Sequence, residues 1–140
     1  MKRAGLFFAI IFVLSTVSVY AQSYTITVSI RDKSSGRGIM VFNPIGLHQE
    51  IYFDPATPLV QGRTYSGEVS WMSRAGRRGI LITGNGIDPE RGIFIHEGQY
   101  SSAWSRGCIV LETNGFNQMY DLLERNVGRN RSGRISIVIE

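Results

Sequence analysis

The sequence predicts a mainly β fold, either a β-sandwich or a partly open barrel, with one helix near its end. Short segments rich in β-forming residues recur along the chain, and two of them, 24–30 and 64–72, alternate with a period of two, as expected of half-buried strands. Turn-forming Gly, Asn and Pro residues separate these segments. Only one segment has helical spacing, whereas a parallel α/β sheet would need helices that alternate with strands.

The first three expected strands end at turn-forming residues. Residues 24–30 alternate β-formers with a period of two, and a Ser- and Gly-rich turn follows at 33–38. Residues 39–42 form a short apolar run and residues 50–53 a third expected strand. They stop at an Asn-Pro and an Asp-Pro pair, both of which favour turns.

The remaining strands surround the two residues of greatest chemical interest. They are expected at 64–72, 79–83, 92–96, 108–111 and 134–140, with an arginine-rich turn at 73–79. His96 ends one of them and Cys108 opens the next. The helix is expected to begin at Asn114 as its cap, to bury apolar residues from Phe116 to Val127, and to stop at Gly128.

The chain begins with a segment that has the features of a secretory signal peptide. Lys2 and Arg3 precede an apolar run over residues 6–19, and Ala21 fits the small-residue rule for signal peptidase. The run is short for a bilayer span of about 20 residues, which favours cleavage over a retained anchor. We therefore expect residues 1–21 to be removed and 22–140 to form one secreted or periplasmic domain, without stable membrane insertion.

Basic side chains are spread along the chain. The formal net charge is +4, and removal of Lys2 and Arg3 lowers it to +2. Small arginine clusters occur at 74–78 and 125–134, a spread that is typical of a solvated surface and predicts no nucleic-acid partner. Attraction to an anionic envelope glycan also fits this charge. Arginine can grip a carboxylate through two parallel hydrogen bonds, which suits a substrate that carries one.

Cys108 is the only cysteine of the chain. Exported proteins usually pair their cysteines, and a single one cannot form an internal disulfide. Three interpretations follow: a reactive thiol, a buried inert thiol, or a disulfide that tethers a homodimer. A cysteine beside an apolar run is commonly a small buried hydrophobe.

The reactive-thiol hypothesis depends on His96. The nucleophile is the thiolate, of which a free cysteine has little at neutral pH, so a neighbouring imidazole is needed. Adjacent strands would bring the two side chains within hydrogen-bond reach. Gly107 leaves room beside the sulfur and lets backbone N–H groups point at an oxyanion. Gly98 allows a sharp turn after His96, where a backbone carbonyl or a hydroxyl can fix the imidazole tautomer.

The stretches IHEG (95–98) and SRGCIVL (105–111) resemble the His-x-Gly … Ser-x-Gly-Cys-Ile-x-Leu motif of the L,D-transpeptidase catalytic domain, the YkuD-like family. The histidine precedes the cysteine, as in that family and unlike in the NlpC/P60 hydrolases. The resemblance implies an exported peptidoglycan enzyme with a β-rich fold, without a metal or organic cofactor. Outside this motif, the chain shares with the family only general features: a β-rich pattern, a helix soon after the cysteine segment and a terminal strand.

Residue by residue, the resemblance implies that Cys108 is the acylated nucleophile and His96 its general base. Gly107, with the Cys108 N–H, corresponds to the oxyanion site. Ser105 would orient the imidazole or the substrate. Gly98 matches the glycine whose backbone supports the histidine.

Three departures from the motif matter. Arg106 stands where many members have His. Val110 stands where many have Arg, so a contact to a substrate carboxylate or a structural contact is missing or supplied elsewhere. The interval from His96 to Cys108 is shorter than in typical members, which implies a trimmed lid. The chain resembles compact, divergent branches of the family, some of them secreted toxins, so the balance of cross-linking, exchange and hydrolysis stays open.

The candidate substrate-binding residues are Gly98, Tyr100, Trp104 and Arg106. The two aromatic residues would line a groove, and ordinary packing is their alternative role. Arg106 would hold a substrate carboxylate or lower the pKa of Cys108, and a plain surface arginine is its alternative. Glu97 is expected to be a solvated charge.

His48 has no partner motif and is expected in a loop. A metal site would need His48, His96 and Cys108 together with a carboxylate. No ligand-pair spacing supports such a site, so no metal is predicted.

These observations predict a secreted cysteine acyltransferase that acts on peptidoglycan stem peptides through a thioacyl intermediate. An amine would resolve that intermediate in transpeptidation, and water would resolve it in carboxypeptidation. The alternative is a catalytically inactive cell-envelope binding module with the same fold. The sequence does not identify an immunity protein or another envelope protein as a partner.

Overall fold

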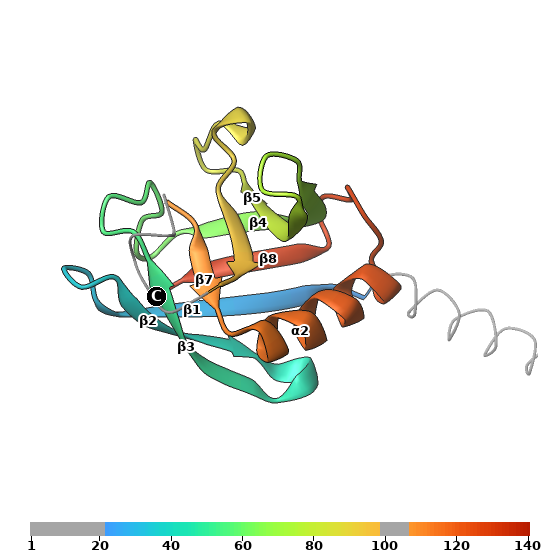
Figure 1. Ribbon diagram of the computed structural model, residues 1–140, viewed down its shortest axis with the longest axis horizontal. Helices are drawn as coiled ribbons and strands as arrows, with labels where there is room; N and C mark the ends of the chain where they lie inside the picture. The colour runs from blue at the N-terminus through green and yellow to red at the C-terminus, as the bar shows by residue number, and fades with distance from the viewer. Residues whose placement is uncertain (1–21, 99–106) are drawn as a thin grey trace, which may run out of the picture.

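The computed structural model describes residues 22–98 and 107–140, which form a closed barrel of eight strands with one α-helix (Figure 1). The expectation of a mainly β fold with a single helix is confirmed for these residues. The barrel is closed, so the finer expectation of a sandwich or a partly open barrel is wrong.

The strand order around the barrel is β1-β2-β3-β7-β6-β5-β4-β8. The strands are β1 Tyr24–Asp32, β2 Arg37–Phe42, β3 Leu47–Phe53, β4 Thr64–Met72, β5 Arg77–Thr83, β6 Phe94–Glu97, β7 Ile109–Leu111 and β8 Ile135–Ile139. The α-helix is α2, Thr113–Asn126, and two 3₁₀ turns are η1, Asn43–Ile45, and η2, Pro89–Arg91.

The last strand closes the barrel because both of its edges are paired. β8 runs parallel to β1, with Ile137 opposite Ile26, and antiparallel to β4, with Ile137 opposite Tyr65. Closure leaves no exposed sheet edge on these strands. Alternation within a strand predicts only which side chains face inward, so it does not distinguish a sandwich from a barrel.

Two expectations about single residues need correction. His48 lies on β3, opposite Val41, and not in a loop. β3 begins early because Gly46, in the left-handed conformation, ends η1 directly before it. Asn114 lies inside the first turn of α2, and the cap position is Glu112, whose carbonyl accepts the Phe116 N–H at 3.0 Å.

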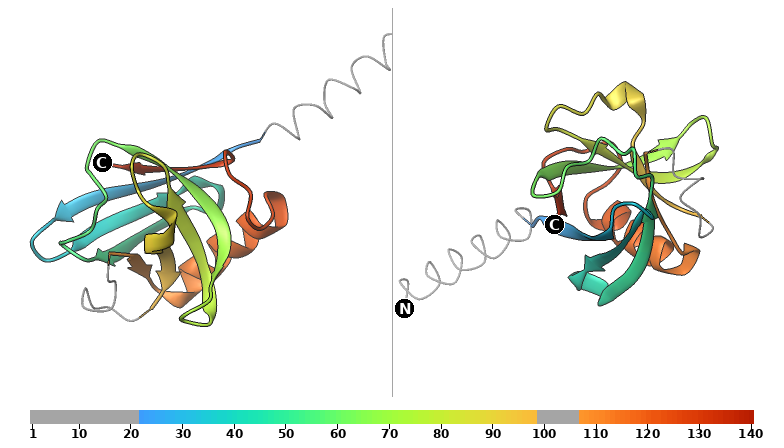
Figure 2. Two further views of the ribbon diagram at one scale, coloured as in Figure 1. Left: turned by 90° about the horizontal axis from the view of Figure 1, so that it is seen from above. Right: turned by 90° about the vertical axis from the view of Figure 1, so that its left-hand side faces the viewer.

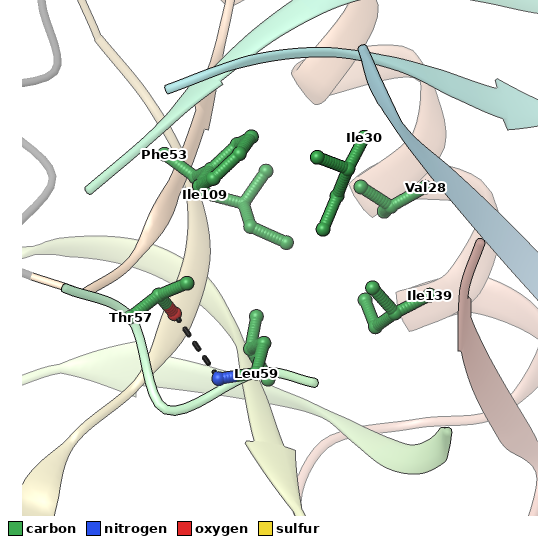
Figure 3. A pocket seen from close by; sticks show the side chains of 7 residues that line it. All are labelled: Val28, Ile30, Phe53, Thr57, Leu59, Ile109 and Ile139. Atoms are coloured by element: carbon green, nitrogen blue, oxygen red, sulfur yellow. Dashed lines mark hydrogen bonds between the residues drawn. The ribbon is translucent and has the colours of Figure 1, made fainter. Parts of the chain in front are cut away.

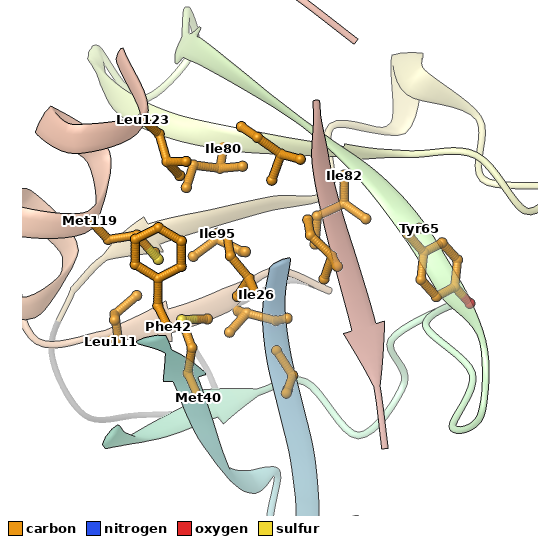
Figure 4. Packing of buried hydrophobic residues seen from close by; sticks show 14 of the residues in the cluster. Ile26, Met40, Phe42, Tyr65, Ile80, Ile82, Ile95, Leu111, Met119 and Leu123 are labelled. Carbon is orange, nitrogen blue, oxygen red and sulfur yellow. The ribbon is translucent and has the colours of Figure 1, made fainter. Parts of the chain in front are cut away.

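α2 and the β3–β4 connection cover opposite ends of the barrel. Phe116, Met119, Tyr120 and Leu123 of α2 join the same buried cluster as the inward-facing barrel residues, some of which are shown in Figure 4. The helix therefore closes the end at which β6 and β7 terminate. The connection at 54–63 lies toward the other end and contributes Leu59 to the core (Figures 1 and 2).

The strands β1 and β2 approach too closely for a side chain at Gly38. A methyl group at Gly38 would lie 2.6 Å from the Ser29 carbonyl oxygen and 3.1 Å from Ile51 Cδ1. Because the first of these atoms is backbone, side-chain movement cannot relieve the clash. We expect Gly38→Ala to lower the free energy of unfolding by about 3 kcal/mol, measured by urea denaturation.

Gly76→Ala is the matched control for this prediction. Gly76 has a φ of +64° and open space around it, so alanine there adds only backbone strain, about 1 kcal/mol. An equal loss of stability in the two variants would contradict the close approach of β1 and β2.

Candidate functional site

The parallel pair β6–β7 forms a wall of the barrel with two different faces. Ile95 lies opposite Ile109, and both side chains belong to the hydrophobic core. His96 lies opposite Val110. Because successive side chains of a strand alternate, His96 and Val110 point to the outer face of the wall. Both are nevertheless buried, with His96 only 7% exposed.

Cys108 belongs to the same outer face, directly before β7. Its sulfur accepts a hydrogen bond from the Phe94 N–H at 3.4 Å, and its S–H donates to the Gly92 carbonyl at 3.6 Å. The thiol is thus anchored at the start of β6, two residues before His96. The structure forms no hydrogen bond between Cys108 and His96. Strand spacing and rise place the Cα atoms of the two residues roughly 8 Å apart.

One ring nitrogen of His96 is fixed by the backbone. Nδ1 lies 2.7 Å from the Glu97 carbonyl oxygen, and since a carbonyl only accepts, Nδ1 carries the proton. Nε2 is then the basic nitrogen of the neutral ring. The same carbonyl also accepts from Arg77 Nη1 at 3.2 Å. Two donors therefore hold this peptide group, and with it the imidazole.

Burial makes both reactive groups neutral at rest. Desolvation lowers the pKa of His96; the Arg77 guanidinium adds to this effect, and the hydrogen bond to Glu97 opposes it. Burial also raises the pKa of the Cys108 thiol, and the Phe94 N–H partly offsets the rise. At neutral pH the site therefore holds a thiol and a neutral imidazole, not a preformed ion pair.

Two glycines frame the pair. Gly107 has a φ of +94°, in the region that favours glycine, and a methyl group there would lie 3.0 Å from Ile93 Cδ1. Its carbonyl accepts from Thr57 Oγ1 at 3.0 Å, which ties the β3–β4 connection to the residue before the cysteine. At Gly98, a methyl group would lie 2.8 Å from Val110 Cγ1 and 4.0 Å from the His96 ring. Gly98 thus leaves space at the outer face, whereas Gly107 is required by its backbone conformation.

The structure brings together four of the expected site residues: His96, Gly98, Gly107 and Cys108. The other four, Tyr100, Trp104, Ser105 and Arg106, lie outside the described residues. Arg77, which was expected in a turn, and Thr57 also contact this site and were not among the predicted site residues. No local pattern could have found them, because both reach the site through contacts with distant segments.

A small apolar cavity lies at the end of the barrel opposite α2 (Figure 3). Side chains of β1, β3, β7 and β8 line it together with Thr57 and Leu59. Its volume of about 10 Å³ is near the minimum for one water molecule. The cavity is therefore too small to be a substrate pocket.

Among residues 22–98 and 107–140, no group of three His, Cys, Asp or Glu side chains is arranged to hold a metal ion. In the same part of the chain, no helix has the length and apolar character needed to cross a bilayer. No protein-family model, curated protein or solved structure matches the chain.

Proposed function

We propose that this protein is an exported cysteine acyltransferase of the L,D-transpeptidase type that acts on peptidoglycan stem peptides. One observation carries the proposal: Cys108 and His96 lie on the same face of two paired strands, with Nδ1 of His96 held by a backbone carbonyl. The motif resemblance supplies the substrate class, and the signal-like N-terminus supplies the periplasmic or secreted location.

The neutral resting pair favours general-base catalysis. Nε2 takes the thiol proton as the sulfur attacks the carbonyl on the L-side of an L–D peptide bond. The tetrahedral intermediate then expels the D-residue, whose amine takes that proton from the imidazolium. The product is a thioester at Cys108. An amine of a second stem peptide, or water, then attacks the thioester and restores the thiol.

Gly107 and Cys108 supply the groups next to the reacting carbonyl. The positive φ of Gly107 turns the backbone directly before the nucleophile. Backbone N–H groups at such a turn can stabilise the oxyanion, which is commonly the largest electrostatic contribution to acyl transfer. The hydrogen bond from Thr57 to the Gly107 carbonyl would keep this turn in place.

A defined muropeptide tests the proposal. Incubation with a disaccharide bearing a tetrapeptide stem should release the terminal D-residue and add the mass of the remaining acyl group to Cys108. Intact-protein mass spectrometry after acid quenching would detect the adduct, and peptide mapping would locate it. If the peptide with an L–D terminal bond stays intact and the protein carries no adduct, the proposal is wrong.

A second candidate function is a non-catalytic envelope binding module. The observation that favours it is the sulfur itself: Cys108 is only 5% exposed, its thiol is bonded to the Gly92 carbonyl, and burial raises its pKa. These are properties of an inert buried thiol. Such a module would bind peptidoglycan without an adduct, and it would bind equally well with alanine at position 108.

A further inference from the structure

Arg77 lies on the outer face of the barrel wall, next to the candidate site. The register of β5 and β6 pairs Ile80 with Ile95, and its continuation places Arg77 beside Gly98. Ile80 faces the core, and Gly79, Arg77 and His96 therefore have the opposite, outward orientation. The order along this face is Cys108, then His96, then Arg77.

The guanidinium of Arg77 is only partly used. Nη1 donates to the Glu97 carbonyl at 3.2 Å, and this is its one hydrogen-bond partner among the described residues. The remaining edge, formed by Nε and Nη2, is the edge that binds carboxylates through two parallel hydrogen bonds. The side chain is half-buried, so a ligand at that edge would be partly shielded from water.

Among residues 22–98 and 107–140, the charge of Arg77 has no acidic partner. The ion pairs of the described residues are Arg78–Asp121 and Arg129–Glu124. The sequences of residues 1–21 and 99–106 contain no Asp or Glu. The neighbouring Arg78 lies on the other face and has several partners. Besides its ion pair with Asp121, it bonds to Asn117 and stacks over the Tyr120 ring.

We propose that Arg77 binds a carboxylate of the acyl donor, away from the bond that is broken. This assignment rests on the proposed function. Arg77 is about four residues along the strand direction and two strands across from Cys108, or roughly 16 Å between Cα atoms, and its long side chain shortens that span. A carboxylate upstream of the attacked carbonyl matches this separation, whereas the carboxylate of the departing residue would lie much nearer the sulfur.

Binding measurements on a Cys108→Ala background isolate recognition from chemistry. The probes are two stem tetrapeptides that differ only in whether the carboxylates upstream of the attacked carbonyl are free or amidated. Isothermal titration calorimetry should give about tenfold tighter binding of the free carboxylate form. Adding Arg77→Gln to the Cys108→Ala variant should remove that preference. Arg77→Lys keeps the charge but cannot form two parallel hydrogen bonds, so it should leave part of the preference.

Arg74→Gln is the matched control, because Arg74 is exposed in the β4–β5 turn and its loss changes the net charge equally. It should leave the preference unchanged. A purely structural role of Arg77 would weaken both peptides alike and leave their ratio unchanged, which would overturn the assignment. If the unmodified protein forms the acyl adduct but Cys108→Ala binds both peptides equally, the Arg77 assignment alone fails. If neither peptide binds and no adduct forms, the proposed function fails with it.

Discussion

Replacing Cys108 with alanine or serine is expected to abolish acyl transfer while leaving the barrel folded. Alanine has no nucleophile. Serine keeps a hydroxyl in place of the thiol, but His96 is a weak base in this buried site and would activate the far less acidic hydroxyl poorly. Product analysis should show at least a 10³-fold loss of D-residue release, since removing a catalytic nucleophile can lower the rate by about 10⁶-fold. Intact-protein mass should show no adduct in either variant.

Thermal unfolding controls for damage to the fold. The sulfur is buried and makes two long hydrogen bonds, but it lies outside the main hydrophobic cluster, so its removal should cost about 1 kcal/mol. Full activity in either variant would exclude the thioacyl mechanism. A loss of activity that accompanies unfolding in alanine but not in serine would leave the serine variant as the decisive measurement.

Local patterns predicted most strands but not how they assemble. The alternation at 64–72 coincides with β4, because inward Tyr65 and Val69 leave outward positions for polar residues. Closure by β8 depends on pairing with β1 at the other end of the chain, and nothing within RISIVIE specifies its partners. The arginine-rich turn was too long for a similar reason: Arg77 and Arg78 extend β5 because Met72 and Trp71 pair with them across the hairpin.

The site could be predicted as far as the motif extends. His96, Cys108 and the glycines beside them follow from local sequence, and the structure brings His96 and Cys108 to one face of the β6–β7 wall. Arg77 and Thr57 could not be predicted from local sequence, since they reach the site from β5 and from the β3–β4 connection. The resting charges also escaped prediction. A sequence shows which groups are adjacent, but their pKa values depend on how deeply the fold buries them.

The two-faced wall explains how one short segment can serve both stability and chemistry. Ile95, Ile109 and Leu111 fix β6 and β7 through the core. The outward residues of these strands are held in place as well, because they share the same backbone. A thiol and an imidazole placed on such strands need little further ordering when a substrate arrives, which lowers the entropic cost of reaching a reactive geometry.

Replacing His96 with glutamine is expected to slow formation of the acyl adduct by about 10²–10⁴-fold at pH 7, the usual contribution of a general base. Glutamine can keep a hydrogen bond to the Glu97 carbonyl but cannot take up the thiol proton. Stopped-flow quenching followed by mass spectrometry would give the rates. The matched control is His48→Gln, because His48 is the other histidine and is exposed on β3, so its loss should leave the rate unchanged.

The pH profile distinguishes a base from a residue that only packs. A base works in its neutral form, and burial lowers the pKa of His96 below its ordinary value of 6.5. The neutral form therefore persists to lower pH, and the rate should hold at pH 6.5 and fall only as the pH drops through the lowered pKa. In His96→Gln this acid limb should vanish. Its rate should instead climb with pH towards the raised pKa of Cys108, as ionisation of the thiol comes to depend on solvent alone. An identical acid limb in both proteins would show that another group is the base.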